Sequence, residues 1–195
     1  YMNDFISFFI CVILITIIYI HFENKIKDVT YVVSKVDGRK YLVRNLDDKE
    51  ESADLLAHIR HDLSKLTQYM KNQYKDDVDV DRMLRNFNPD NISETDKNSK
   101  YTSYSVNKGE KMVFCLRSRD DKNTLVKKNI MMFVALHELA HTMTKSIGHT
   151  EEFWNNFRRI LKDAIKINIY NRLNYNENPV DYCGMKITDD PLNSE

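Results

Sequence analysis

The sequence predicts an α+β domain that follows a single N-terminal transmembrane helix. Three observations lead to this prediction: an uncharged apolar run near the N-terminus, two β-rich segments interrupted by short turns, and several segments whose apolar residues recur at helical spacing. With 195 residues, of which 42% are hydrophobic, the chain is long enough for one domain with a sizeable core. We therefore expect a membrane anchor over residues 1–22 and one domain over residues 23–195.

The N-terminal run from Phe5 to Phe22 contains no Asp, Glu, Lys or Arg. As a helix it would span about 27 Å, close to the roughly 30 Å of the hydrocarbon core of a bilayer. A cleaved signal peptide is disfavoured because the segment lacks a basic start and a small-residue cleavage site. Lys25 and Lys27 follow the run, and the positive-inside rule then places the domain in the cytoplasm of a single-pass protein, in a cellular or viral membrane.

The charge balance excludes one broad class of partner. Lys plus Arg and Asp plus Glu number 29 each, so no net field attracts the chain to nucleic acid or to an acidic membrane surface. The three cysteines, Cys11, Cys115 and Cys183, are odd in number and lack CxxC spacing. That pattern argues against a disulfide framework and favours a reducing compartment.

Residues 29–117 carry the predicted strands and the first helices. A hairpin is expected over 29–45 around Asp37-Gly38, the dipeptide typical of a type I′ turn. A helical part over 48–87 begins with a long amphipathic helix to about residue 73. A second hairpin over 101–117 pairs Tyr101–Val106 with Lys111–Arg117.

Two histidines on the long helix raise the question of a metal site. His58 and His61 are three residues apart, and Asp54 and Asp62 stand four residues either side of His58. A two-ligand chelate is conceivable, but these residues also fit a solvated polar face, on which histidines and carboxylates pair. One helix alone cannot close a metal site, so the polar face is the preferred interpretation.

The stretch "HELAH" in the predicted helix over 125–144 is the strongest chemical signal in the chain. His137 and His141 are four residues apart, which places both imidazoles on one helix face, where they can bind the same ion. Glu138 is rotated by about 100° from His137, which suits a general base acting on water that a metal activates. This is the HExxH arrangement of zinc peptidases.

A catalytic Zn²⁺ requires a third protein ligand and leaves its fourth position open. His149 is the best candidate, because Gly148 can take a positive φ, end the helix and turn the next residue back toward the site. Thr150 would then cap a supporting helix, so that the two helices together occupy residues 125–174. The alternative third ligands are Glu151, Glu152 and Asp163.

The sequence "HELAHTMTKSIGHTEEFW" resembles the zincin metallopeptidases of the WLM and SprT-like groups, in which HExxH is followed by a short turn and a third ligand. It does not fit the metzincin spacing. The resemblance implies a zincin-like metallopeptidase domain with a small antiparallel or mixed sheet, an active-site helix and a supporting helix. By analogy Lys111–Arg117 would be the edge strand that binds an extended substrate by β-augmentation.

Further residues near the C-terminus have several possible roles. Tyr175, Tyr182 and Arg172 are candidate donors to the oxyanion of the transition state, and the sequence does not choose among them. Cys183 is either a metal ligand, an inhibitory thiolate, or a small thiol without a catalytic role.

The sequence therefore predicts a membrane-anchored, zinc-dependent endopeptidase that acts on a protein or peptide substrate. In it His137, His141 and His149 bind Zn²⁺, and Glu138 activates water. Two other hypotheses remain open. One is a non-catalytic, membrane-tethered protein with a zincin-like fold, such as a virion component, and the other is a WLM- or SprT-like protease of DNA–protein crosslinks.

Overall fold

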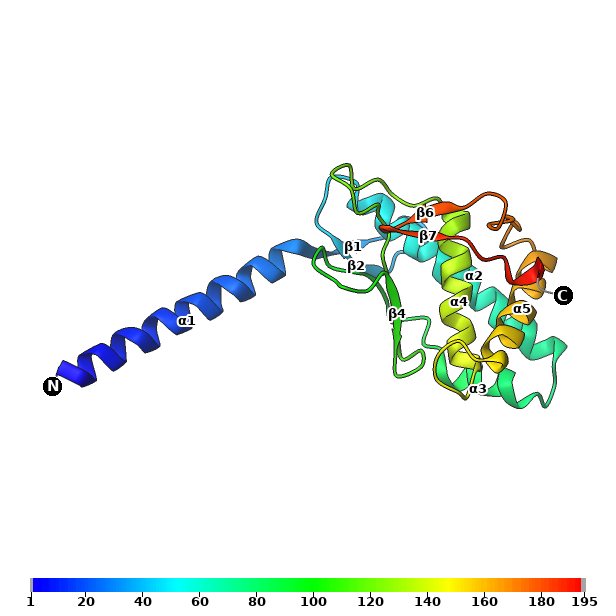
Figure 1. The fold of residues 1–195 in the computed structure, drawn as a ribbon, viewed down its shortest axis with the longest axis horizontal. Coiled ribbons are helices and arrows are strands. Elements are labelled where there is room, and N and C mark those ends of the chain that lie inside the picture. Colours follow the sequence, from blue (N-terminus) through cyan, green and yellow to red (C-terminus); the bar gives the residue numbers. More distant parts are fainter. Residues whose placement is uncertain (1, 194–195) are drawn as a thin grey trace.

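A computed structural model describes residues 2–193, and the side chains of 5–23 and 28–193. Figure 1 shows a long helix, α1 (Met2–Asp28), that projects away from a domain of packed helices and short strands. The fold is of the α+β class that the sequence predicts, and its sheets have only two or three strands each. The helices therefore provide most of the core, and two strands of the three-stranded sheet described below pack against it with buried residues.

Helix α1 has the properties of a membrane span. The stretch Phe5–Glu23 has a mean hydropathy of 2.6, and none of it is buried against the domain. By length and composition it is able to cross a membrane. The side chains of Lys25 and Lys27, on which the predicted orientation depends, lie outside the described side chains. Helix α1 runs directly into the first strand without an intervening linker.

The first hairpin differs from the prediction in its turn. Strands β1 (Val29–Val33) and β2 (Lys40–Arg44) are antiparallel, with Val33 opposite Lys40. Of the Asp37-Gly38 pair only Gly38 has a positive φ, so residues 34–39 form a longer loop and no type I′ turn. The reason is that Asp37 is used for side-chain bonding: its carboxylate accepts from the Arg39 backbone and from the Tyr41 hydroxyl.

Helices α2 (Lys49–Gln73) and α3 (Val78–Asn86) form one wall of the domain. The buried face of α2 contains Leu56, Ile59, Leu63, Leu66 and Met70. Asp77 caps α3 by accepting from the backbone N–H groups of Asp79 and Val80.

The three-stranded sheet corrects the predicted edge strand. Strands β3 (Ile92–Glu94), β4 (Ser103–Val106) and β5 (Lys111–Phe114) are arranged in the order β3-β5-β4. Strand β3 pairs in parallel with β5, while β4 pairs with β5 in antiparallel. Lys111–Arg117 therefore does not form the edge, because β5 is paired on both sides; β3 and β4 are the edge strands, and β4 is the one that lines the cleft described below.

Two helices follow the sheet and carry the histidines. Helix α4 (Lys128–Met143) lies at the centre of the domain, and α5 (Glu151–Lys166) packs beside it (Figure 1). The first helix does not start at Leu125 as predicted, because Leu125 forms a β-bridge to Arg117 and the Val126 N–H donates to Leu116. The second ends well before residue 174, because Asn168 takes a left-handed φ of 58°.

The C-terminal segment returns across the domain as a small hairpin of β6 (Val180–Tyr182) and β7 (Met185–Ile187), followed by the 3-10 helix η1 (Pro191–Asn193). Cys183, at its tip, forms a disulfide with Cys115 at the end of β5, and both residues are buried. This finding contradicts the prediction that the cysteines form no disulfide. Two cysteines separated by 68 residues leave no local spacing signal, and only the fold brings them together.

Arg117 is a buried cation that joins several elements. Only 2% of it is exposed, and its guanidinium donates to Glu94 of β3, to Asp48 at the start of α2 and to Ser52. The other oxygen of Glu94 accepts from the Arg44 backbone of β2. Burial raises the pKa of Glu94, and the bond from Arg44 and the charge of Arg117 oppose that shift. The β1–β2 sheet, the three-stranded sheet and α2 are thus connected through one ionic cluster.

The turn between β4 and β5 lies very close to the helices. A Cβ added to Gly109 would lie 2.7 Å from Cγ2 of Thr142 in α4 and 2.9 Å from the backbone oxygen of Asn86 in α3. The Gly109 carbonyl also accepts from the Asn88 N–H. This close packing fixes the position of the turn relative to α4.

We expect Gly109→Ala to lower the free energy of unfolding by about 3 kcal/mol or more, because it combines a positive φ with a clash against backbone. Gly38→Ala is the matched control: Gly38 also has a positive φ but has no atom within 4 Å of the added Cβ. Its cost should be about 1–2 kcal/mol. Urea unfolding of the detergent-solubilised full chain measures both, and equal losses would contradict the packing argument.

Candidate metal centre

Three histidines converge at the C-terminal half of α4. The Nε2 atom of His137 lies 3.2 Å from Nε2 of His141 and 3.0 Å from Nε2 of His149. The possible ligand atoms of the three residues all lie within 4.8 Å of one another. Within the described part of the chain, these three histidines form a group that could hold a metal ion.

Local structure explains how His149 reaches the two helical histidines. Gly148 has a φ of +83°, the left-handed conformation that turns the chain after α4. Thr150 then caps α5, and its hydroxyl accepts from the Phe153 N–H. The ring of Phe153 stacks on His141 with centroids 4.4 Å apart and packs against His149 at 4.7 Å. The start of α5 therefore provides an aromatic support for the imidazoles.

The charge state and spacing of the histidines fit a zinc ion. Burial, followed by repulsion from the neighbouring histidines, lowers the pKa of His137 to about 3, and burial lowers that of His141 to about 4. The rings of His137 and His141 are therefore neutral at pH 7, as ligands must be. A neutral Nε2 cannot share one proton with two other nitrogens, whereas a cation between the three would satisfy all of them. With Zn–N bonds of about 2.0–2.1 Å, tetrahedral ligands lie about 3.3 Å apart.

The alternative third ligands do not join this group. The Glu152 carboxylate accepts from the backbone N–H groups of Lys145 and Ser146. Asp163 lies further along α5 and accepts a hydrogen bond from the Tyr74 hydroxyl. Glu151 is exposed at the start of α5. His58 and His61 are also exposed, on the outer face of α2.

Glu138 lies beside the histidines and is 6% exposed. Burial raises its pKa to about 7, and a hydrogen bond from the Ser105 backbone opposes part of that shift. Leu139 and Thr142, on the following turn of α4, are fully buried as well, so this part of the helix is enclosed by the domain. A carboxyl group with a pKa near neutrality can both accept and release a proton at pH 7.

A cleft of about 790 Å³ opens over the histidines and Glu138. Strand β4 lines one side, and the C-terminal segment from Tyr182 to Pro191 lines another. Phe133, Val134, Trp154 and Phe157 add apolar surface. A C-terminal segment that folds back over the cleft is one of the arrangements that the sequence allows, and the structure has it.

The backbone of β4 presents free hydrogen-bonding groups to this cleft. The Cys115 N–H donates to the Thr102 carbonyl, so residues 102, 104 and 106 face β5. Ser103 and Ser105 then direct their backbone groups to the open edge. The bond from the Ser105 N–H to Glu138 agrees with this assignment.

The candidate oxyanion donors are placed differently from one another. Tyr182 lines the cleft, but its hydroxyl is 2.6 Å from the Ser103 hydroxyl and donates to the Cys115 carbonyl. Tyr175 is buried against Phe133, with centroids 4.7 Å apart. Arg172 pairs with Asp190. Of the three, only Tyr182 is a cleft residue, and Cys183 is a disulfide partner without a free thiolate.

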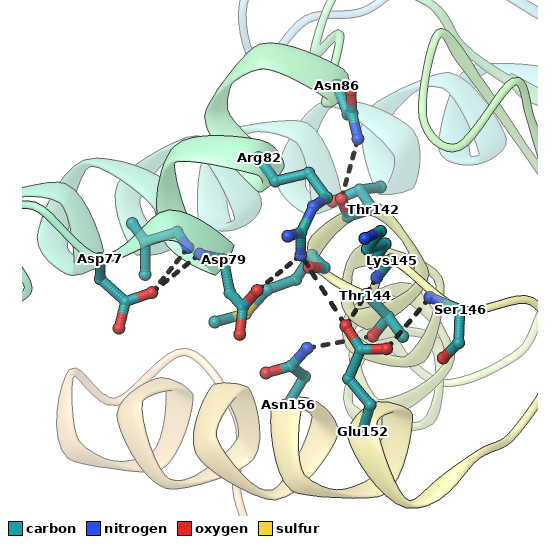
Figure 2. Close-up of polar contacts among 12 residues, drawn as sticks. Asp77, Asp79, Arg82, Asn86, Thr142, Thr144, Lys145, Ser146, Glu152 and Asn156 are labelled. Atoms are coloured by element: carbon teal, nitrogen blue, oxygen red, sulfur yellow. Dashed lines mark hydrogen bonds and ion pairs between the residues drawn. The ribbon is translucent and has the colours of Figure 1, made fainter.

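Polar contacts around Arg82 hold the end of α4 against α3 and α5 (Figure 2). The Arg82 guanidinium donates to the carboxylate of Asp79 and to the Met143 carbonyl, both at 2.6 Å, and lies 3.9 Å from Glu152. Asn86 donates to the Thr142 carbonyl, and Asn156 donates to the Thr144 hydroxyl. The segment that leads to His149 is therefore attached to both neighbouring helices.

Comparison with known proteins agrees with this fold. The WLM domain profile matches residues 35–190. Uncharacterized protein R325 of Acanthamoeba polyphaga mimivirus is 32% identical over 191 residues, or 96% of each chain. Uncharacterized protein 042R of Invertebrate iridescent virus 3 is 41% identical over 69 residues, 35% of this chain and 42% of that protein. The crystal structure of Wss1 from Saccharomyces cerevisiae has a TM-score of 0.50 at 22% identity, covering 65% of this chain and 88% of that one.

The fold and the cluster of three histidines are those expected of a metallopeptidase family. The match over most of the domain is decisive for the family: this chain belongs to the WLM domain family, a family of zinc-dependent proteases. The likeness to Wss1 shows a shared fold.

The start of α5 gives a pH-dependent prediction. Hydrogen bonds from the Lys145 backbone, then from the Ser146 side chain and backbone, lower the pKa of Glu152 to about 2 from its ordinary 4.5. A depressed folded-state pKa stabilises the protein above pH 4.5, and that stabilisation disappears as the pH falls toward about 2. Glu152→Gln should therefore be less stable than wild type at pH 7, and the difference should shrink below pH 4.5.

Urea midpoints between pH 7 and pH 3, measured with chelator present, provide the test. Glu151→Gln removes the same charge from the same helix turn and is the matched control. A difference between wild type and Glu152→Gln that stays constant over this range would contradict the prediction.

Proposed function

We propose that this protein is a membrane-anchored, zinc-dependent endopeptidase. The observation that carries the proposal is the convergence of three imidazoles beside a buried carboxyl group, in a cleft bordered by a free strand edge. The membership in a family of zinc-dependent proteases supports the same function.

In this proposal His137, His141 and His149 hold zinc. A bound zinc ion would supply a Lewis acid that polarises the scissile carbonyl and activates water for attack. Glu138 takes a proton from the attacking water and delivers it to the leaving amine, a task for which a pKa of about 7 is suited. The Ser105 N–H holds the Glu138 carboxylate on the side of the cleft where β4 lies.

The substrate is an extended peptide that adds to the edge of β4. The outward-facing N–H and C=O groups of Ser103 and the C=O of Ser105 provide the backbone hydrogen bonds. Such bonds do not depend on sequence, so selectivity comes from the apolar walls formed by Phe133, Trp154 and Ile187. A folded substrate does not fit this arrangement unless a segment of it is extended.

We expect Glu138→Gln to reduce peptide hydrolysis by about 10²–10⁴-fold while it retains zinc, because only the proton transfer is lost. His149→Ala should lower both the zinc content and the activity. His61→Ala is the matched control, since His61 is an exposed histidine outside the cluster. Elemental analysis of the purified full chain, with a peptide-library cleavage assay on the same samples, measures both quantities, and removing zinc with a chelator should abolish cleavage.

The outcomes distinguish the competing functions. Retained hydrolysis by Glu138→Gln would sink the assignment of the base, and unchanged zinc in His149→Ala would move the third ligand elsewhere. Stoichiometric zinc without cleavage by the wild-type chain would instead favour a non-catalytic, membrane-tethered protein. Cleavage that requires DNA would favour the crosslink-protease hypothesis.

The membrane anchor is a separate part of the proposal. The exposed apolar stretch of α1 supports a single span. Lys25 and Lys27 favour a cytoplasmic domain by the positive-inside rule, whereas the disulfide between Cys115 and Cys183 favours an oxidising compartment. The two features therefore place the domain on opposite sides of the membrane.

We expect the full chain to remain with membranes after alkaline extraction, and a chain that starts at Glu23 to be released. On the denatured full chain a bulky maleimide should label only Cys11 before reduction and all three cysteines after it, because the disulfide protects the other two. Release of the full chain would exclude the anchor. Three labelled thiols without reductant would indicate a reducing compartment and support the cytoplasmic orientation.

A further inference from the structure

The segment between α4 and α5 is the least enclosed part of the metal centre. Residues 144–149 contain no helix or strand, and the side chains of Lys145 and His149 are exposed. Ile147 is 89% exposed, so the segment is not held by apolar packing at that point. A ligand on such a segment would lose conformational freedom on binding a metal, unless other contacts already fix the backbone.

Lys108 provides one set of such contacts. Its ammonium group donates to three consecutive carbonyls, those of Thr144 at 2.7 Å, Lys145 at 2.6 Å and Ser146 at 3.0 Å. These three bonds use all the donors of a lysine. The carbonyls follow the C-terminal end of α4, where the helix dipole favours a positive charge.

The β4–β5 turn is built to place Lys108 there. Asn107 and Lys108 both have a positive φ, 47° and 56°, which is costly for residues other than glycine. The adjacent Gly109 allows the turn to approach Thr142 of α4. A lysine in an ordinary surface turn extends into solvent, whereas this one is half-buried and bound to backbone.

Glu152 holds the same segment from the opposite side. Its two carboxylate oxygens accept from the N–H groups of Lys145 at 2.8 Å and Ser146 at 3.0 Å. Figure 2 shows this carboxylate between the segment and Arg82 of α3. Residues 145 and 146 thus have their carbonyls bound by Lys108 and their N–H groups bound by Glu152.

We infer that Lys108 and Glu152 are positioning residues that fix the backbone before His149 and thereby set the metal affinity of the site. The inference rests on the proposed zinc centre. Neither residue belongs to the histidine cluster, and in this inference each acts on the metal through the backbone that carries His149. Because Lys108 lies in the turn that follows β4, the strand that borders the cleft and the segment that carries His149 belong to one connected unit.

The test is the affinity of the full chain in detergent for Zn²⁺, measured by competition with a chromogenic chelator. We expect Lys108→Met and Glu152→Gln each to weaken binding by about 10–100-fold, the usual effect of removing a group that orients a ligand. Lys145→Met and Glu151→Gln are the matched controls, because each removes the same charge from a neighbouring exposed side chain. They should bind zinc as wild type does.

A double-mutant cycle separates positioning from general loss of structure. If Lys108 acts through His149, Lys108→Met should change the affinity of the His149→Ala variant by less than about 2-fold. The absorption of bound Co²⁺ gives a second readout: Lys108→Met should shift its visible bands toward those of His149→Ala. Glu152→Gln provides the same comparison from the other side of the segment, should Lys108→Met fail to fold.

Wild-type affinity in both Lys108→Met and Glu152→Gln would overturn the inference, as would equal losses in the wild-type and His149→Ala backgrounds. A wild-type chain that binds no zinc, or binds it equally well without His149, would refute the proposed zinc centre instead. The two failures are therefore distinguishable in one set of titrations.

Discussion

The close approach of the β4–β5 turn to the end of α4 is the contact on which the rest of the site depends. It is possible because Gly109 has no side chain where Thr142 and the Asn86 backbone lie. From this contact the position of β4 follows, with the Ser105 N–H beside Glu138, and so does the reach of Lys108 to the carbonyls after α4. A small shift of the turn would move the Ser105 N–H beside Glu138, the open edge of β4 and the backbone support of His149 together.

The domain treats its buried charged groups in two different ways. Glu94 is paired with Arg117 and bound by backbone, which compensates the loss of hydration and stabilises the junction of strands and α2. Glu138 is almost as buried as Glu94. Its pKa is set by burial and by the Ser105 backbone, with no contribution from a cationic side chain among the described residues. A carboxyl group kept at the edge of protonation is a poor structural element but a suitable proton carrier, which is typical of functional sites.

Much of the metal centre is foreseeable from sequence because its determinants are local. The four-residue spacing of His137 and His141 places them on one helix face, and Gly148 predicts the turn that brings His149 back. The rest depends on pairing between distant segments. Strand β3 is three residues long and joins β5 in parallel, so neither its existence nor the resulting edge position of β4 is visible in the residue pattern. The same holds for the Cys115 disulfide, whose partner is 68 residues away.

That disulfide also keeps the domain covalently joined if the backbone is cut between Cys115 and Cys183. It closes a covalent ring that contains all of α4 and α5, and therefore all three histidines and Glu138. Exposed segments without regular structure, such as the one over residues 145–149, are where proteolytic nicking concentrates. A single cut inside the ring leaves the two pieces joined, and the packed helices remain in place around the metal centre. Reduction of the disulfide would remove the covalent link between the two pieces, and the same cut could then separate them.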